Sequence, residues 1–175
     1  MRTDCALNIV LIGMPGAGKS TVGVLLAKRL GYHFIDTDLL IQTGEQARLQ
    51  QIIAERGLEA FKRVEERVLC SLKTGHSVIA TGGSAVYSEP AMRHLAELGR
   101  LVFIDVPLAE LKKRVDDMDT RGLALDPGED FSHLFARRRP LYQKWAGITV
   151  EGTNMNPGQI AATIETMVCS DSRPE

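Results

Sequence analysis

Apolar residues along the chain gather in short continuous runs that alternate with longer amphipathic stretches. NIVLI (8–12), SVIAT (77–81) and LVFIDV (101–106) are unbroken and rich in β-branched residues, and HFID (33–36) and ITV (148–150) are weaker runs of the same kind. Unbroken apolar runs of this length are typical of strands that are buried on both faces. We therefore predict that these runs are strands.

The stretches between these runs have the spacing and the start signals of helices. Pro90, Pro107 and Pro157 each stand where a first helical turn would begin. Strands that alternate with helices predict a parallel sheet that is covered by helices on both sides. The predicted helices are KSTVGVLLAKRL (19–30), a long stretch from about 46 to 73, PAMRHLAELG (90–99), PLAELKKRVDDM (107–118) and PGQIAATIETMV (157–168).

Two segments interrupt this alternation. Residues 38–75 are mostly helical in pattern but too long for a simple crossover between strands. Residues 119–133 are polar and contain Gly122, Pro127 and Gly128. A loop of that length inside a compact domain is typical of a lid over a site, so we predict a lid at 119–133.

Composition excludes several classes of protein. A length of 175 residues favours one domain, residues 1–175, and 21 basic against 22 acidic residues give no electrostatic argument for nucleic acid or a membrane surface. Cys5, Cys70 and Cys169 are far apart and form no CxxC pair, so neither a zinc site nor a disulfide framework is indicated. The N-terminal apolar run is too short to span a bilayer. We expect a cytoplasmic monomer that binds neither nucleic acid nor membranes.

The strongest chemical signal is GMPGAGKS at 13–20. It fits GxxxxGK[ST] and lies between a predicted strand and a predicted helix, which is the context that this phosphate-binding motif requires. The glycines would let backbone N–H groups surround phosphate oxygens, next to the positive end of the helix. Lys19 would reach the β- and γ-phosphates, and Ser20 would bind Mg²⁺. The chain is therefore predicted to bind a nucleoside triphosphate, but the motif does not separate hydrolysis, phosphate transfer and switching.

Two carboxylates follow the second predicted strand in FIDTD (34–38). If Asp36 and Asp38 both belong to the strand end, its period of two places their side chains on one face. This is the carboxyl edge of the sheet, where ligands bind in open α/β folds, and TGGS (81–84) ends another strand at the same edge. Two plainer interpretations stay open. Asp36 could cap a turn, and the glycines could form a tight connection.

The whole set resembles the shikimate kinase family. GMPGAGKSTVG, FIDTD, AFKRVEE, IATGGSAV, the Arg121 loop, RRPLYQKWA and NPGQI follow the order of that family over about residues 8–165. The resemblance implies a three-layer α/β/α P-loop fold of the nucleoside-monophosphate-kinase type, with a five-stranded parallel sheet, a helical acceptor-binding insertion at about 38–75 and a lid loop. It also implies transfer of the γ-phosphate of ATP, with Mg²⁺, to the 3-hydroxyl of shikimate, a step of aromatic amino-acid biosynthesis.

The resemblance further implies roles for single residues. Asp38 corresponds to the aspartate that binds the acceptor hydroxyls and is a candidate base, and Arg121 corresponds to the lid arginine that reaches the moving phosphate. Arg114 corresponds to an arginine that stacks on adenine, and Arg138 to one that pairs with the shikimate carboxylate. The expected catalytic residues are Lys19, Asp38 and Arg121. The expected nucleotide contacts are Gly13, Gly16, Ala17, Gly18, Lys19, Ser20, Thr21, Arg114 and Asn154. The expected acceptor contacts are Asp38, Lys62, Gly82, Gly83 and Arg138, and the expected metal site is formed by Ser20 and Asp36.

Three positions differ from the family pattern. Lys62 stands where the family usually has an arginine that grips the carboxylate, and lysine lacks the bidentate fork of that arginine. Ser84 replaces the third glycine of a glycine run, and Gly122 follows the lid arginine in place of proline. Because these positions lie on the acceptor side or the lid, another hydroxy acid such as homoserine is an alternative acceptor. A nucleotide-binding module without kinase activity and a kinase for a nucleoside monophosphate or another metabolite are further alternatives.

Overall fold

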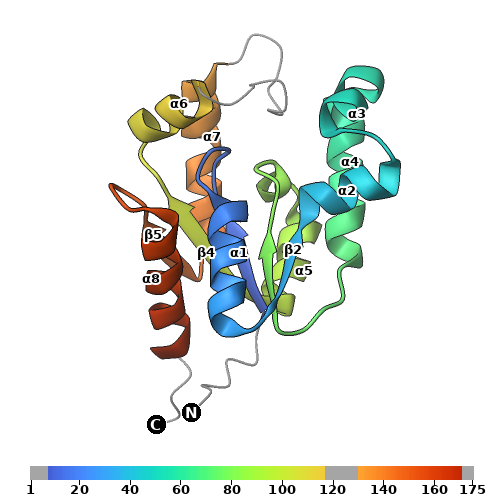
Figure 1. Cartoon of the computed structure of the whole chain (residues 1–175). Coiled ribbons are helices and arrows are strands. Elements are labelled where there is room, and N and C mark those ends of the chain that lie inside the picture. The colour runs from blue at the N-terminus through green and yellow to red at the C-terminus, as the bar shows by residue number, and fades with distance from the viewer. Residues whose placement is uncertain (1–7, 117–129, 171–175) are drawn as a thin grey trace.

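The computed structural model describes residues 8–116 and 130–170 (Figure 1). Five strands form a sheet in the order β2-β3-β1-β4-β5, and every neighbouring pair is parallel. The strands are β1 (Asn8–Ile12), β2 (His33–Asp36), β3 (Ser77–Ala80), β4 (Gly99–Asp105) and β5 (Ile148–Glu151). The five predicted strands and their parallel arrangement are therefore confirmed.

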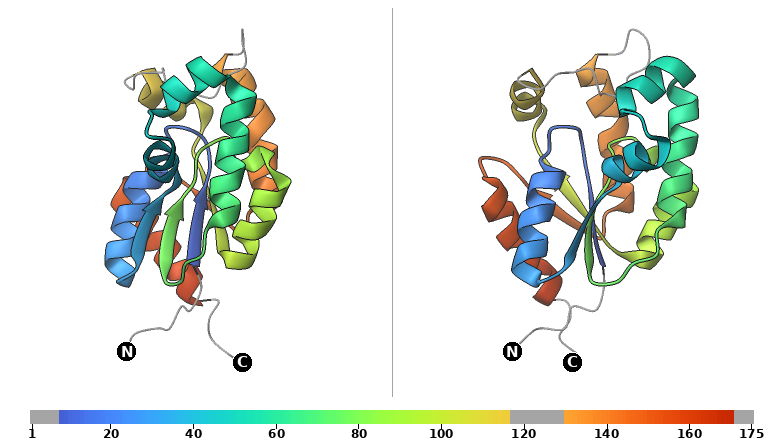
Figure 2. Two further views of the ribbon diagram at one scale, coloured as in Figure 1. Left: turned by 90° about the vertical axis from the view of Figure 1, so that its right-hand side faces the viewer. Right: turned by 45° about the vertical axis from the view of Figure 1, so that its right-hand side comes forward.

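Helices cover both faces of this sheet, as the alternation of strands and helices predicts (Figure 2). On one face α1 and α8 pack side by side, and α4, α5 and α7 lie on the other. The helices are α1 (Lys19–Leu30), α2 (Thr37–Glu45), α3 (Leu49–Arg56), α4 (Leu58–Ser71), α5 (Glu89–Leu98), α6 (Leu108–Asp116), α7 (Phe131–Trp145) and α8 (Pro157–Ser170), with a short 3-10 helix η1 (Ala85–Tyr87).

The main core lies between the sheet and its helices. All five residues of β1 and all four of β3 are buried, because β1 is the central strand and β3 its neighbour. This burial on both faces explains why these strands read as unbroken apolar runs rather than as alternating ones. The ends of β1, β2 and β3 then lie at one edge of the sheet, next to the phosphate-loop motif.

The FIDTD stretch is not strand throughout. Strand β2 ends at Asp36, and α2 begins at the next residue. Asp36 is the N-cap of α2, since its side chain accepts hydrogen bonds from the backbone N–H groups of Asp38 and Leu39. The period-two argument for Asp36 and Asp38 is therefore wrong, because the second aspartate lies in a helical turn. The turn-cap interpretation of Asp36 is confirmed.

The predicted long helix at about 46–73 is also wrong in its bounds. Three helices, α2, α3 and α4, occupy residues 37–71. Gln46 has the left-handed conformation, with φ 51°, and ends α2. Gly57, with φ 81° and ψ 164°, separates α3 from α4 in a conformation that glycine adopts readily. The three helices enclose a small second core of Ile41, Ile52, Phe61 and Val64.

Helix α7 was missing from the predicted helices, and it overlaps the predicted lid. The lid range 119–133 extends into α7, because Asp130 is the N-cap of α7 and Phe131 is its first residue. Residues 119–129 of that range lie outside the described residues. Pro140 stands inside α7. Proline is unusual in the interior of a helix, so its presence concealed this helix in the sequence.

Candidate active site

The phosphate loop joins β1 to α1 in the conformation that its glycines allow. Gly13, Gly16 and Gly18 have φ angles of 147°, 79° and 88°, which residues with a Cβ rarely adopt. A Cβ at Gly13 would also lie 2.8 Å from the carbonyl oxygen of Ile104. Gly18 is the N-cap of α1, and no side chain caps that helix. The first N–H groups of α1 are therefore directed into the loop, where an anion can accept their hydrogen bonds.

Lys19 crosses the inside of the loop. Its side chain is buried, and Nζ donates hydrogen bonds to the carbonyl oxygens of Gly13 at 2.8 Å and Met14 at 2.9 Å. Burial lowers the pKa of Lys19 to about 8, while the negative charge of Asp38 opposes this shift. Ala17 is buried at the loop's centre and Thr21 is exposed in the first turn of α1.

Ser20 and Asp36 form a pair of oxygen groups beside the loop. Ser20 Oγ donates to Asp36 Oδ2 at 2.7 Å, so the strand end of β2 and the start of α1 meet here. No group of three or more His, Cys, Asp or Glu side chains in residues 8–116 and 130–170 is placed to hold a metal ion alone. Mg²⁺ suits the observed pair, because it commonly takes one or two protein oxygens and completes its shell with water and phosphate.

Asp38 lies in the first turn of α2 and faces the β3 strand end. A Cβ at Gly82 would lie 2.8 Å from Asp38 Oδ1 and would overlap Glu65 Oε1. Glycine at position 82 is therefore required for these two carboxylates to approach the same point. The backbone N–H of Gly82 donates to Thr37 Oγ1 at 3.2 Å, which fixes the β3 end against the start of α2.

Glu65 is a component of the site that the sequence analysis missed. It projects from α4, is 2% exposed, and accepts a hydrogen bond from Ser84 Oγ at 2.6 Å. Its other oxygen, Oε1, and Asp38 Oδ1 are buried and have no hydrogen-bond partner among the described residues. Two buried acceptor atoms without partners are costly. Both oxygens converge on Gly82, so a hydrogen-bond donor placed there would satisfy them.

The charges of these groups are coupled. Burial raises the pKa of Glu65 to about 7, the Ser84 hydrogen bond opposes that rise, and the charge of Asp38 adds to it. Burial also raises the pKa of Asp38, against the attraction of Lys19. The site therefore holds two carboxyl groups with raised pKa values next to a lysine with a lowered pKa, a pattern that clusters at functional sites.

Arg138 lies on the other side of the glycine pair. It is 1% exposed, and its Nε donates to the hydroxyl of Tyr87 at 3.1 Å. A Cβ at Gly83 would be 3.0 Å from Arg138 Nη1, and the Gly83 carbonyl accepts a hydrogen bond from the Tyr142 hydroxyl at 2.6 Å. Arg138 is thus held against the β3 end. Of its two arginine neighbours, Arg137 is exposed, whereas Arg139 is half-buried and pairs with Asp105 at 2.7 Å.

Lys62 lies further out on α4. Its ammonium pairs with Glu59 at 2.7 Å and lies 5.4 Å from the centre of the Tyr87 ring. Lys62 lines a pocket of about 200 Å³ together with Glu65, Ser84 and Tyr87. Helix α4 therefore brings both Lys62 and Glu65 to the region around Ser84.

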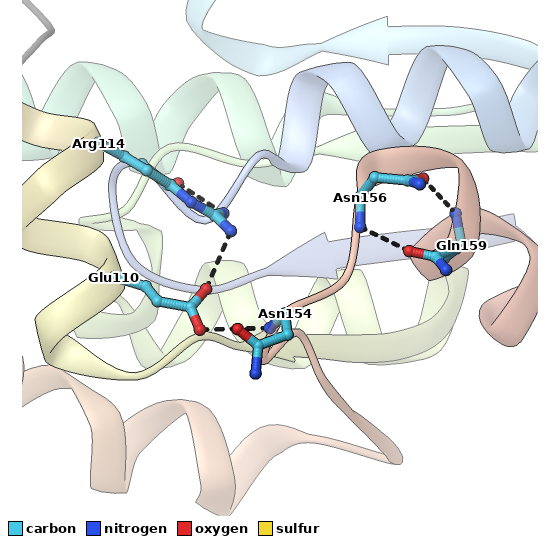
Figure 3. A network of polar contacts seen from close by, with 6 residues as sticks. Glu110, Arg114, Asn154, Asn156 and Gln159 are labelled. Carbon is cyan, nitrogen blue, oxygen red and sulfur yellow. Dashed lines mark hydrogen bonds and ion pairs between the residues drawn. The ribbon is translucent and has the colours of Figure 1, made fainter.

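Arg114 and Asn154 lie together at the other end of the phosphate loop. Arg114 Nη1 approaches the Gly16 carbonyl at 3.4 Å, and its Nη2 pairs with Glu110 at 3.2 Å. Glu110 also accepts a hydrogen bond from the backbone N–H of Asn154 at 3.2 Å (Figure 3). The structure thus places the predicted acceptor contacts around Gly82 and Gly83 and the predicted adenine contacts at Gly16 of the phosphate loop. Arg121 lies outside the described residues.

A phosphate loop at the start of α1, a pair of oxygen groups beside it and two buried carboxylates at the neighbouring strand end are typical of a P-loop phosphotransferase. Its fold is of the nucleoside-monophosphate-kinase type. A family model described as shikimate kinase matches residues 15–169. The chain belongs to the shikimate kinase family, and it is accordingly an ATP-using phosphotransferase with an alcohol acceptor.

Individual relatives agree with that membership. The chain is 36% identical over 162 residues to the shikimate kinase of Mycobacterium ulcerans, covering 91% of this chain and 88% of the relative. It is 38% identical over 157 residues to that of Thermobifida fusca, covering 89% and 91%. The solved structure of shikimate kinase from Acinetobacter baumannii in complex with shikimate superposes with a TM-score of 0.85, at 32% identity and with 94% of each chain covered. None of the helices in the described parts of the chain has the length and apolar character needed to cross a membrane.

Proposed function

We propose that this chain phosphorylates the 3-hydroxyl of shikimate with the γ-phosphate of ATP and with Mg²⁺. The observation that carries the acceptor is the pair of buried, unpartnered carboxylate oxygens of Asp38 and Glu65 on either side of Gly82. Two acceptor atoms that converge on one point suit a ligand with neighbouring hydroxyl groups. Family membership supports the same substrate.

The proposed mechanism is an in-line transfer without a covalent intermediate. The loop N–H groups and Lys19 bind the phosphates of ATP, and Arg121 neutralises charge on the moving phosphoryl group. Mg²⁺, held by Ser20 and with Asp36 in its water shell, would supply further charge neutralisation at the phosphates. Asp38 orients the acceptor hydroxyl and accepts its proton, which the raised pKa of Asp38 favours.

The acceptor carboxylate is proposed to bind at Arg138 and Lys62. Arg138 is buried beside Gly83, so its guanidinium charge is poorly screened there. Arg114 and Asn154 are proposed to contact the adenine base, at the opposite end of the phosphate loop. The segment at 119–133 is proposed to exclude water from the site, because a site open to water would hydrolyse ATP.

Homoserine is the alternative acceptor, and the carboxylate pair distinguishes it from shikimate. Homoserine carries one hydroxyl, and its ammonium group is on the carbon next to its carboxylate. With that carboxylate at Arg138 the ammonium lies away from the pair, so one of the two buried oxygens has no donor. Leaving one buried acceptor unsatisfied costs about 1–3 kcal/mol. We therefore expect shikimate to be preferred.

The test is ADP release from Mg-ATP in the presence of shikimate, homoserine or no acceptor, together with mass detection of the phosphorylated product. We expect shikimate 3-phosphate from the wild type and a loss of at least about a hundredfold in kcat for Lys19→Ala and Asp38→Asn. Arg138→Ala should mainly raise KM for shikimate. A control is Arg93→Ala on α5, whose ion pair with Glu89 is exposed and includes none of the proposed contacts. Full turnover in Asp38→Asn, or turnover of homoserine but not of shikimate, would contradict the proposal.

A further inference from the structure

Three cationic side chains meet at the ring of Tyr87. Lys62 Nζ lies 5.4 Å from the ring centre, and the guanidinium carbons of Arg137 and Arg138 lie 5.3 Å and 5.1 Å from it. Each distance is within the range of about 6 Å over which a cation is attracted to an aromatic ring. The Tyr87 hydroxyl also accepts the hydrogen bond from Arg138 Nε. One half-buried residue of η1 therefore contacts cations from both α4 and α7.

The Tyr87 ring attracts these cations in a different way than a carboxylate would. An aromatic face attracts positive charge through its quadrupole and does not cancel that charge. The Glu59 partner of Lys62 is 75% exposed on its side chain, and such a surface ion pair contributes little. The ammonium of Lys62 can therefore exchange Glu59 for the carboxylate of a ligand at small cost, while the ring keeps the lysine stem in place.

The position of Tyr87 connects this cluster to the acceptor site. Tyr87 and Lys62 line the same pocket as Glu65 and Ser84. Glu65 in turn converges with Asp38 on Gly82. The cation cluster and the carboxylate pair thus border one region, the first suited to the acid group of an acceptor and the second to its hydroxyls.

We propose that Tyr87 is a positioning residue for recognition of the acceptor carboxylate, because its ring and hydroxyl hold Lys62 and Arg138 for one shared anion. This inference rests on the proposed function of Lys62 and Arg138 as carboxylate contacts. A lysine ammonium is a point charge on a flexible stem and has no fixed fork of donors. Lys62 therefore depends on its surroundings for orientation, and the Tyr87 ring supplies that orientation.

The experiment is a double-mutant cycle on the full chain with Tyr87→Leu, Lys62→Met and the combined variant, measured by steady-state kinetics with shikimate and ATP. Each single change should raise KM for shikimate by about tenfold, with kcat and KM for ATP within about twofold of the wild type. The combined variant should be no worse than Tyr87→Leu alone, because Tyr87→Leu already removes the orientation on which the contribution of Lys62 depends. Tyr87→Phe keeps the ring, so Lys62→Met should still raise KM in that background.

Several outcomes would overturn the role of Tyr87. Independent, multiplying effects of Tyr87→Leu and Lys62→Met would do so, as would an equal loss in KM for ATP or no change in KM for shikimate. Tyr32→Leu serves as the control, since Tyr32 packs against His76 away from these cations. Thermal unfolding of each variant identifies misfolded protein. If Tyr87→Leu is misfolded, Tyr87→Phe decides, because it removes the hydroxyl that accepts from Arg138 Nε and should therefore raise KM for shikimate. An unchanged KM in Tyr87→Phe would then overturn the role of Tyr87. If the wild type does not turn over shikimate in the same assay, the proposed function itself fails, which is a separate result.

Discussion

At the scale of single residues, Glu65 is a buried group whose charge responds to pH near neutrality. Burial raises its pKa from 4.5 to about 7. Between these values the folded chain keeps a proton that the unfolded chain has lost, so the folded state loses stability as pH rises through this window. We expect the free energy of unfolding of the wild type to fall by roughly 3 kcal/mol across it, relative to Glu65→Gln. Urea unfolding at a series of pH values measures this difference.

Ser84 sets where that window ends. Its hydroxyl donates to Glu65 and favours the ionised form, so Ser84→Ala should extend the fall in stability to higher pH. Ser88→Ala is the matched control, because that hydroxyl donates to Glu66 instead. Parallel stability curves for the wild type and Glu65→Gln would show that Glu65 does not titrate in this range.

At the scale of elements, α6 connects the phosphate loop to the loop between β5 and α8. The carboxylate of Glu110 contacts both Arg114 and the backbone N–H of Asn154. Asn154 has a φ of 54°, which is unusual for a residue with a side chain. The two proposed contacts to adenine are therefore held by a single residue. Glu110→Gln keeps the shape but replaces one of the two acceptor oxygens with a donor group.

We expect Glu110→Gln to weaken binding of ADP by about three- to tenfold, because one held contact corresponds to about 1 kcal/mol. Binding of pyrophosphate, which needs the phosphate loop alone, should not change. Isothermal titration calorimetry with both ligands measures the contrast. Glu165→Gln is the control, since Glu165 pairs with Arg29 between α8 and α1. An equal loss for ADP and pyrophosphate would instead place the effect of Glu110 on the phosphate loop.

At the scale of the whole molecule, the sequence was sufficient for the sheet and for α1, because burial on both faces and the phosphate-loop glycines leave strong local patterns. The acceptor side was less predictable. Gln46 takes a left-handed conformation without being glycine, so its break between helices has no clear signal. Glu65 reads as part of a solvated charged helix, KRVEE, because its partner Ser84 lies 19 residues further along the chain. Only the fold brings that pair together.

The two ends of the parallel sheet differ in role, with the candidate active site at one end and a set of stabilising hydrogen bonds at the other. The strands end at the site, whereas they begin at the opposite edge, near the first described residue (Figure 1). There Asn8 is 4% exposed and makes three hydrogen bonds. Its amide donates to the carbonyl oxygens of Thr74 and Leu98, and its oxygen accepts from the N–H of Ser77. One side chain thus ties the starts of β1, β3 and β4.

Asn8→Ala leaves those three backbone groups without the partner that they have in the wild type. We expect it to lower the free energy of unfolding by about 3 kcal/mol and the melting temperature by roughly 6–12 °C, as thermal and urea unfolding would show. Gln50→Ala, an exposed amide on α3, is the control and should change neither. Below the transition, kcat and both KM values of Asn8→Ala should equal those of the wild type, because no proposed contact lies at this edge. A fall in kcat of the folded variant would mean that a change where the strands begin alters the positions of the carboxylates and of the phosphate loop where the strands end.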